Sequence, residues 1–298
     1  MSAVTTGARV SLRNILVATD FSEYSAKALD YGAQIAQRYD STIHLLHVIR
    51  PGIPNELLSP QSLPDDIERE KQAAEEQLQS WAQRLNEIQY KTWLKYGDVP
   101  EVVKTLMAVE NVDLIVLGTH GRSGLKKLVL GSVAQAIFRE ADCPVLTIGP
   151  KTHDIALPGK LRNVLYAVDP LEESHCALDY AVSLAEKNGA TLTLLHVMAQ
   201  DTPARPSLER EAECRELVAG LIPGDAQLAA AANCRIEFSK SPTSMIIAVA
   251  HELPADLLVM DVRREEAWTA HLPDNAYAVV AQAACPVLTV HTVRKRES

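Results

Sequence analysis

Three glycines and a serine within residues 113–132 have the types and spacing of a phosphate-binding loop. Gly118 and Gly121 are separated by two residues, Gly131 follows after nine more, and Ser132 comes directly after it. Each glycine lets backbone N–H groups approach an anion that a Cβ would obstruct. Ser132 stands where a helical pattern begins, so its hydroxyl can cap the helix or bind phosphate at the positive end of the helix dipole.

The spacing matches neither G-x-G-x-x-G nor the pattern G-x-x-x-x-G-K-[ST]. Two interpretations therefore stay open from the spacing: an anion site, and a loop whose glycines only turn the chain.

Asp20 is a second candidate for chemistry. It ends the apolar run Asn-Ile-Leu-Val-Ala-Thr-Asp, which is typical of a buried strand. A carboxylate in this place suits the hydroxyls of a ribose, as in dinucleotide sites. The alternative role is structural, because Asp is also a helix cap and a helix start is expected near Ser22.

An alternation of strands and helices must position these residues. The strands are predicted at residues 14–20, 42–49, 90–96, 113–117 and 143–148, and the helices at 25–38, from 65 or 66 to about 88, at 100–109 and after Ser132. Such alternation predicts a parallel α/β sheet, in which ligands bind beyond the carboxyl ends of the strands. Asp20 and Gly118 both lie at such ends.

The same pattern occurs a second time. Residues 163–169 and 194–197 match 14–20 and 45–48 at one offset of 149, and a Cys-Pro-Val-Leu-Thr run closes both halves. We therefore predict two homologous domains, 1–150 and 161–298, joined by a linker at 151–160.

Composition limits the class of protein. The 298 residues are 47% hydrophobic and 22% charged, which is ordinary for a globular chain of about two domains. A net charge of −9 argues against a nucleic-acid partner. No apolar run approaches the length of a membrane span, and the N-terminus is polar, so we expect no membrane partner. Five cysteines without a C-x-x-C pair suit a reducing, cytoplasmic setting, and we expect mostly buried thiols.

Four motifs together resemble the universal stress protein family: Asp-Phe-Ser after the first strand, Leu-Leu-His-Val in the second, the Gly-Thr-His-Gly loop with nine residues to Gly-Ser, and the closing Cys-Pro-Val-Leu strand. The resemblance spans nearly the whole chain in two copies. It implies two tandem, open, five-stranded, mainly parallel sheets flanked by helices, of the Rossmann-like type seen in adenine nucleotide alpha hydrolases. It also implies ATP as the ligand, with or without Mg²⁺, and a tandem chain that is a covalent version of the family's dimer.

Carried over by position, the resemblance implies a set of nucleotide-binding residues. They are Ala18, Thr19, Asp20, Val48, Leu117, Gly118, His120, Gly121, Arg122, Gly131, Ser132 and Val133. Asp20 and its neighbours would meet the ribose and adenine side, and the backbone of Val48 would hold the adenine edge. The glycines and Ser132 would surround the phosphates.

Other polar residues give weaker signals. His47 and His196 recur on strands and are expected to be hydrogen-bonded core histidines. His120 could donate to phosphate or be merely exposed, and Lys126 and Lys127 could offset phosphate charge or be solvated. No Ser-His-Asp arrangement and no metal-ligand spacing stands out, so we expect no catalytic residue, no metal ligand and at most slow ATP hydrolysis.

The second copy departs from the pattern at the phosphate positions. Asp261 replaces Gly118 and Arg264 replaces Gly121, while Pro273 and Asp274 take the places of Gly131 and Ser132. Carboxylates there would repel phosphates, and side chains would obstruct backbone amides. We predict that this half binds no triphosphate in the same manner. Asp169 keeps the place of Asp20, but Pro170 follows it, so its role could be structural only.

Three functional hypotheses follow. The first is an ATP-binding stress-response or signalling module with one site in the N-terminal domain and a C-terminal pseudo-domain. The alternatives are a weak ATPase or nucleotide-dependent enzyme of a related fold, and an interaction scaffold that binds no nucleotide. The halves are expected to form an intramolecular pseudo-dimer through strands 143–148 and 285–290, and a further homodimer is open.

Overall fold

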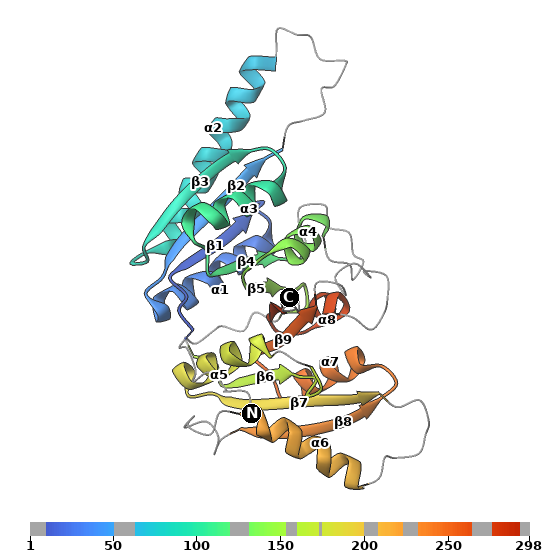
Figure 1. Cartoon of the computed structure of the whole chain (residues 1–298). Helices are drawn as coiled ribbons and strands as arrows, with labels where there is room; N and C mark the ends of the chain where they lie inside the picture. Colours follow the sequence, from blue (N-terminus) through green and yellow to red (C-terminus); the bar gives the residue numbers. More distant parts are fainter. Residues whose placement is uncertain are drawn as a thin grey trace, which may run out of the picture. The chain divides into compact units, whose positions relative to one another are not determined.

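The computed structural model describes residues 10–50, 63–119, 131–152, 160–172, 175–199, 208–222, 232–263 and 276–292. These residues form two compact units. Within the described ranges, the first unit contains residues 11–119 and 131–145, and the second contains residue 10 and everything from 146 onward. The two units reproduce one architecture, an α/β fold with a parallel sheet (Figure 1).

The first unit is built on parallel strands in the order β3-β2-β1-β4, with β5 beginning beside β4. Its strands are β1 (Asn14–Thr19), β2 (Thr42–Ile49), β3 (Tyr90–Tyr96) and β4 (Leu114–Gly118). The strand β5 (Val145–Ile148) begins at the last residue of this unit, and its other residues belong to the second unit. The helices are α1 (Glu23–Tyr39), α2 (Leu63–Ala82), α3 (Val99–Glu110) and α4 (Ser132–Glu140), and a short 3₁₀ turn, Gln83–Leu85, follows α2. The predicted α/β class with parallel strands is confirmed.

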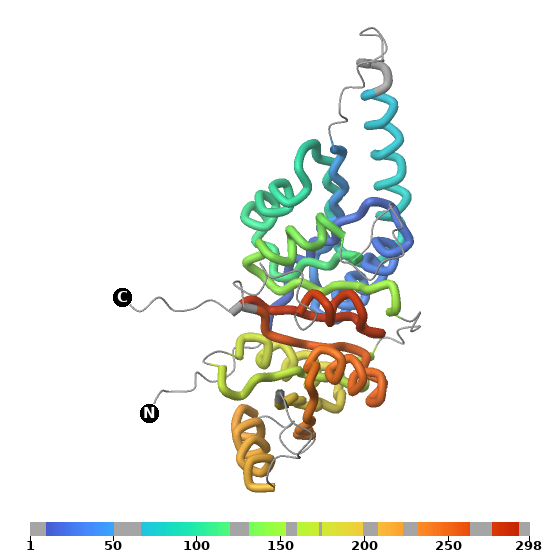
Figure 2. Tube along the Cα trace, turned by 90° about the vertical axis from the view of Figure 1, so that its right-hand side faces the viewer, coloured from blue at the N-terminus to red at the C-terminus, as the bar shows by residue number. Residues whose placement is uncertain are grey.

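The helices cover both faces of this sheet. Helix α1 packs on β1 and β4, and α2 packs on β2 and β3, whereas α3 contacts β1 and α4. Figure 2 shows α1 and α2 on one side of the strands and α3 and α4 on the other. Because the sheet is covered twice, its central strands are apolar on both faces, and Ile15, Leu16 and Val17 are fully buried.

Local sequence signals explain where the helices begin and end. Ser22 caps α1, and its hydroxyl accepts from the Ser25 N–H at 3.3 Å. Asp98 caps α3 in the same way, with Pro100 in the first turn. Asp40 and Asn111 end these two helices in the left-handed conformation, which Asn and Asp tolerate better than most residues.

The second unit repeats the fold with strands in the order β10-β9-β6-β7-β8, all parallel. Its strands are β6 (Asn163–Ala167), β7 (Thr191–Ala199), β8 (Asn233–Ser239), β9 (Leu257–Arg263) and β10 (Val287–Thr292). Its helices are α5 (Cys176–Asn188), α6 (Leu208–Gly220), α7 (Pro242–Glu252) and α8 (Ala276–Gln282). None of the described helices is both long and apolar enough to cross a bilayer.

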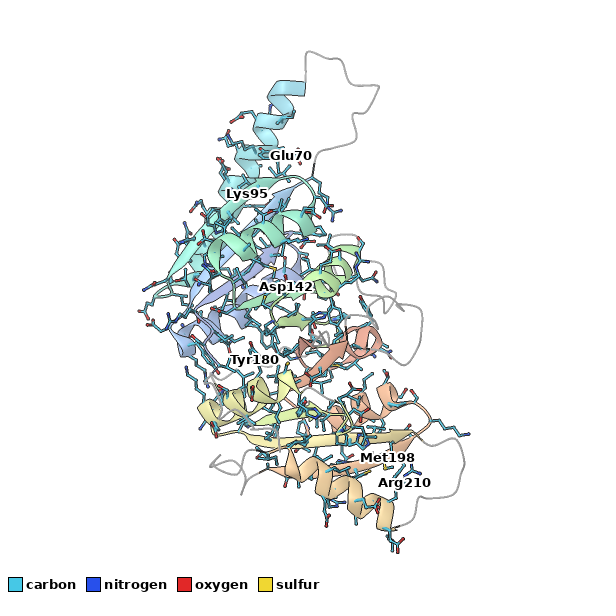
Figure 3. All side chains as sticks on the ribbon, viewed as in Figure 1. Glu70, Lys95, Asp142, Tyr180, Met198 and Arg210 are labelled. Carbon is cyan, nitrogen blue, oxygen red and sulfur yellow. The ribbon has the colours of Figure 1, made fainter. Side chains whose placement is uncertain are left out.

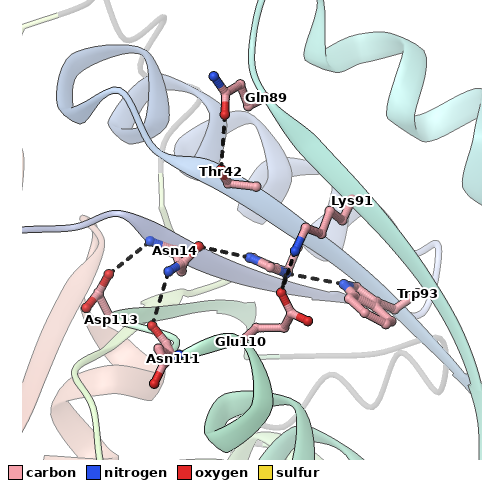
Figure 4. A network of polar contacts seen from close by, with 9 residues as sticks. Asn14, Thr42, Gln89, Lys91, Trp93, Glu110, Asn111 and Asp113 are labelled. Carbon is pink, nitrogen blue, oxygen red and sulfur yellow. Dashed lines mark hydrogen bonds and ion pairs between the residues drawn. The ribbon is translucent and has the colours of Figure 1, made fainter.

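One carboxylate in each unit ties the start of the first strand to the start of the fourth. Asp113 Oδ2 accepts from the N–H groups of Arg13 and Asn14 at 2.8 and 2.9 Å. Asp256 accepts in the same way from Arg162 and Asn163 (2.7 and 2.9 Å). Figure 4 shows this anchor at Asn14 and Asp113, where the strands begin. The repeat read from the sequence thus extends to hydrogen bonds.

The cysteines correct one expectation. All five are free thiols, but only Cys285 is buried, and Cys143, Cys176, Cys214 and Cys234 are partly exposed. These four lie before a strand, at the start of α5, on α6 and on the edge strand β8, so they border the core. Burial still raises the pKa of the Cys143 and Cys285 thiols to about 12.

Candidate functional site

A cavity of about 470 Å³ lies in the first unit, where β1, β2 and β4 end and α4 begins. This is the switch point of the sheet, because the chain leaves β1 toward β2 on one side and β4 lies on the other. The cavity is lined by nine of the twelve residues expected from the sequence: Ala18, Thr19, Asp20, Val48, Leu117, Gly118, Gly131, Ser132 and Val133. The other three, His120, Gly121 and Arg122, lie outside the described residues, as do Lys126 and Lys127.

Asp20 shapes the turn that leaves β1. Its Oδ1 accepts from the Ser22 N–H and from the Ser25 hydroxyl, both at 3.0 Å. Thr19 Oγ1 accepts from the N–H of Phe21 (2.9 Å), which adopts a positive φ of 62°. Asp20 therefore organises the start of α1, although Ser22 is the cap itself. Asp20 also lines the cavity, so a contact with a ribose stays a prediction.

The main chain of Val48 faces the cavity side of β2. Backbone groups alternate in direction along a parallel strand, and the carbonyl of Ile49 accepts from the Gly97 N–H beyond β3 at 3.1 Å. The backbone N–H and C=O groups of Val48 must then point toward β1. The pairing of β1 with β2 ends at Thr19. The Phe21 N–H would be the next donor for the Val48 carbonyl, but it donates to Thr19 Oγ1 instead. This leaves the Val48 carbonyl directed at the cavity.

The start of α4 forms another wall of the cavity. Its N-cap is Gly131, which has no side chain to bond the first amides of the helix. Ser132 is the first helical residue and does not cap the helix, so the capping interpretation of this serine is wrong. The Gly131 N–H donates to the Thr119 carbonyl at 2.8 Å and joins the helix start to the end of β4.

Packing, and not only the cavity, requires a glycine at position 118. A Cβ at this position would lie 2.9 Å from the carbonyl carbon and the Cβ of Tyr24, in the first turn of α1. Glycine is therefore required for α1 to approach β4, whatever binds nearby.

An aromatic chain connects the cavity to α2. His47 Nδ1 donates to the Thr19 carbonyl at 2.8 Å, and the His47 ring packs on Phe21 with 4.3 Å between centroids. Phe21 in turn contacts Trp81 edge-on at 5.4 Å. In the second unit, His196 Nδ1 donates to the Val168 carbonyl at 3.0 Å. The expected hydrogen bonds are confirmed for both histidines, but neither is a core residue, because both are half-buried and His47 lines the cavity.

Sequence reasoning missed several lining residues, among them Arg50, Glu70 and Val99. Arg50 directly follows β2, so its position at a strand end was a usable signal. Val99 begins α3, another element end. No sequence pattern predicts that Glu70 lines the cavity. The packing of α2 decides which face of this helix meets the cavity.

The corresponding place in the second unit is filled by a side chain. Asp261, at the position of Gly118, accepts from the Tyr166 hydroxyl at 2.6 Å and from the Ala177 N–H at 2.9 Å. Helix α5 begins at Cys176, the counterpart of Lys27, so it starts one turn later than α1. The burial of this carboxylate raises the pKa of Asp261.

Other substitutions in this unit are only partly visible. Asp169 Oδ1 accepts from the Leu171 N–H at 3.1 Å, which repeats the turn-forming bond of Asp20. Arg264, Pro273 and Asp274 lie outside the described residues. Across the described parts of both units, no group of three or more His, Cys, Asp or Glu side chains is placed to hold a metal ion.

Comparisons with known proteins agree with this architecture. The model of the universal stress protein family matches the chain twice, over residues 11–149 and 160–291. A universal stress protein of Mycolicibacterium smegmatis is 28% identical over 221 residues, which cover 70% of this chain and 74% of that protein. Universal stress protein A homolog 1 of Coxiella burnetii is 32% identical over 142 residues, or 47% of this chain and 97% of the relative.

A solved structure has the same fold over nearly the whole chain. The crystal structure of a universal stress protein from Archaeoglobus fulgidus superposes with a TM-score of 0.69 at 22% identity, covering 96% of this chain and 99% of that one. Since the family model accounts for most of the sequence in two consecutive copies, the chain belongs to the universal stress protein family as a tandem member.

Proposed function

We propose that the first unit binds ATP in the cavity at its switch point, and that the protein is a nucleotide-dependent stress-response or signalling module. The second unit is then a pseudo-domain that binds no ATP. We also propose a cytoplasmic location, which the cysteine usage supports. The observation that carries the proposal is the meeting of Asp20, Val48 and the start of α4, whose N-cap Gly131 has no side chain, around one cavity.

The residues present fit a nucleotide. The cavity of about 470 Å³ lies within the range of small-molecule sites, roughly 300–1,000 Å³. The start of α4 offers amides and a positive dipole end to phosphates. Asp20 can accept from ribose hydroxyls, and Val48 offers a carbonyl to a base. Mg²⁺ would accompany the triphosphate, since this ion commonly binds through substrate phosphates and water.

The second unit supports a single site. Asp261 puts a carboxylate where the first unit has a glycine, and its two hydrogen bonds hold it there. A phosphate near this position would meet like charge in a partly buried setting, where screening by water is weak.

Isothermal titration with a non-hydrolysable ATP analogue tests the proposal. The full chain should bind one analogue. Asp20→Asn should weaken binding about tenfold or more, since Asn keeps an oxygen for the Ser22 amide but loses the charge that attracts a ribose hydroxyl. Asp169→Asn in the second unit is the matched control and should leave the affinity unchanged.

Three results would contradict the proposal. Two sites per chain would remove the pseudo-domain, and no binding at millimolar analogue would favour a nucleotide-independent scaffold. ATP turnover that Asp20→Asn abolishes, with binding intact, would favour an enzyme.

A further inference from the structure

Helix α2 contributes one charged side chain to the wall of the cavity. Glu70 lies on its N-terminal half, which Figures 1 and 3 show extending past the edge of the sheet, with Glu70 labelled there. Its side chain lines the cavity and is otherwise exposed to solvent. The helix itself is held by Ala74, Leu78 and Ala82, all buried.

Glu70 belongs to one end of the cavity. Helix α2 packs on β2 and β3, so its contribution lies on the side of Val48 and Arg50. The uncapped start of α4 comes from the other side of the switch point, after β4. Because the proposed function places phosphates at α4 and the base at Val48, Glu70 is at the base end.

We propose that the Glu70 carboxylate makes the site select a purine with an amino group at position 6. This inference rests on the proposed nucleotide function and deepens it. Adenine carries an N6 amino group, a donor that an ionised carboxylate accepts as a charge-assisted hydrogen bond. Hypoxanthine and guanine carry an oxygen at position 6 and a hydrogen on N1, so a carboxylate that faces position 6 rather than N1 meets a second acceptor and is repelled.

The positive end of α4 sets the direction in which a nucleotide enters, because it favours the triphosphate at the end of the cavity opposite Glu70. Arg50 lines the same end as Glu70 and carries the opposite charge. Glu70 therefore acts on the base and not on the orientation of the ligand. Its exposure to solvent limits the effect, so we expect a factor of about ten in affinity.

Inosine triphosphate tests this contact, because it has an oxygen in place of the N6 amino group and a hydrogen on N1, and is otherwise identical to ATP. Titration calorimetry on the full chain at fixed Mg²⁺ would compare ATP with inosine triphosphate for the unchanged protein and for Glu70→Gln and Glu70→Ala. The control is Glu75→Gln, an exposed glutamate of the same helix that does not line the cavity.

The unchanged protein and the control should bind ATP about tenfold more tightly than inosine triphosphate. In Glu70→Ala the preference should vanish through loss of ATP affinity. In Glu70→Gln it should vanish partly through tighter binding of inosine triphosphate, because a rotated amide donates to O6.

The results separate this inference from the function beneath it. If all four proteins prefer ATP over inosine triphosphate to the same degree, Glu70 does not select the base, and the proposed ATP site is unaffected. A parallel loss of both ligands in the Glu70 variants also overturns it, since selection requires the ratio to change. No ATP binding by the unchanged protein overturns both.

Discussion

A side chain at position 118 would collide with α1 before it reached any ligand. Gly118 lies where the Tyr24 backbone crosses the end of β4, so the absent Cβ allows the helix and strand to pack. At the counterpart position, Asp261 accepts from the Ala177 amide in the first turn of α5, which begins at Cys176. A single glycine in a binding motif can thus serve packing and access together.

Gly118→Ala should lower the free energy of unfolding by about 1–3 kcal/mol, the usual cost of overpacking. Chemical denaturation followed by circular dichroism measures it. Gly220→Ala is the control, because nothing lies within 4 Å of the added Cβ at the end of α6, and alanine suits a helix. Unchanged stability in Gly118→Ala, with nucleotide binding lost, would show that this glycine serves the ligand alone.

At the scale of elements, the two ends of the first sheet have different roles, since one borders the cavity and the other holds a polar network. The carboxyl ends of β1, β2 and β4 open into the cavity, whereas the opposite ends close around the polar network of Figure 4. There, His44 is fully buried on β2, and its Nδ1 accepts from the Trp93 indole N–H at 3.3 Å. Its Nε2–H then donates to Asn14 Oδ1 at 3.2 Å, because an indole N–H can only donate.

This network predicts acid sensitivity. Burial lowers the pKa of His44, opposed by Glu110 of α3, whose Oε2 lies 3.6 Å from Nδ1, while Lys91 of β3 lowers it further. The folded protein thus takes up a proton at lower pH than the unfolded chain does. The stability from neutral His44 is full above pH about 6.5 and is lost as the pH falls toward the folded pKa.

His44→Gln should remove this acid loss, because an amide can accept from Trp93 and donate to Asn14 without titrating. Urea denaturation between pH 7.5 and pH 5 compares the two proteins. The exposed His251 on α7 provides the control variant, His251→Gln, which should behave like the unchanged protein. Parallel curves for His44→Gln and the unchanged protein would show that His44 does not couple stability to pH.

At the scale of the whole molecule, one fold occurs twice with different contents at the switch point. In the first unit the ends of β1, β2 and β4 border a cavity. In the second, the Asp261 carboxylate is joined to Tyr166 and to the start of α5. The chain contains two copies of the same α/β fold. They differ at the switch point, where Asp261 stands at the position of Gly118.

ATP should therefore slow amide hydrogen exchange in one unit only. Exchange measured by mass spectrometry on the full chain should fall for residues 14–22, 46–50 and 131–137, since a ligand bound only to the native state suppresses opening. The corresponding residues 163–171 and 195–199 should not change. Equal protection in both units would show that Asp261 does not exclude the nucleotide.

The sequence by itself determined the class of fold, the repeat and part of the lining of the cavity. Periodicity located the strands closely, with residues 42–49 and 90–96 matching β2 and β3. These signals are local, because a buried strand must be apolar and a helix start needs a cap. The family motifs then pointed to nine of the residues that line the cavity.

Only the tertiary structure decided which parts of the chain share that cavity and how. The packing of α2 on β2 and β3 places Glu70 at the wall of the cavity, and no sequence pattern near β2 predicts this. The approach of Tyr24 gives Gly118 its second role, and the Ala177 amide and the Tyr166 hydroxyl hold the Asp261 carboxylate in place. Each of these depends on contacts between segments distant in sequence, and a local pattern carries no information about them.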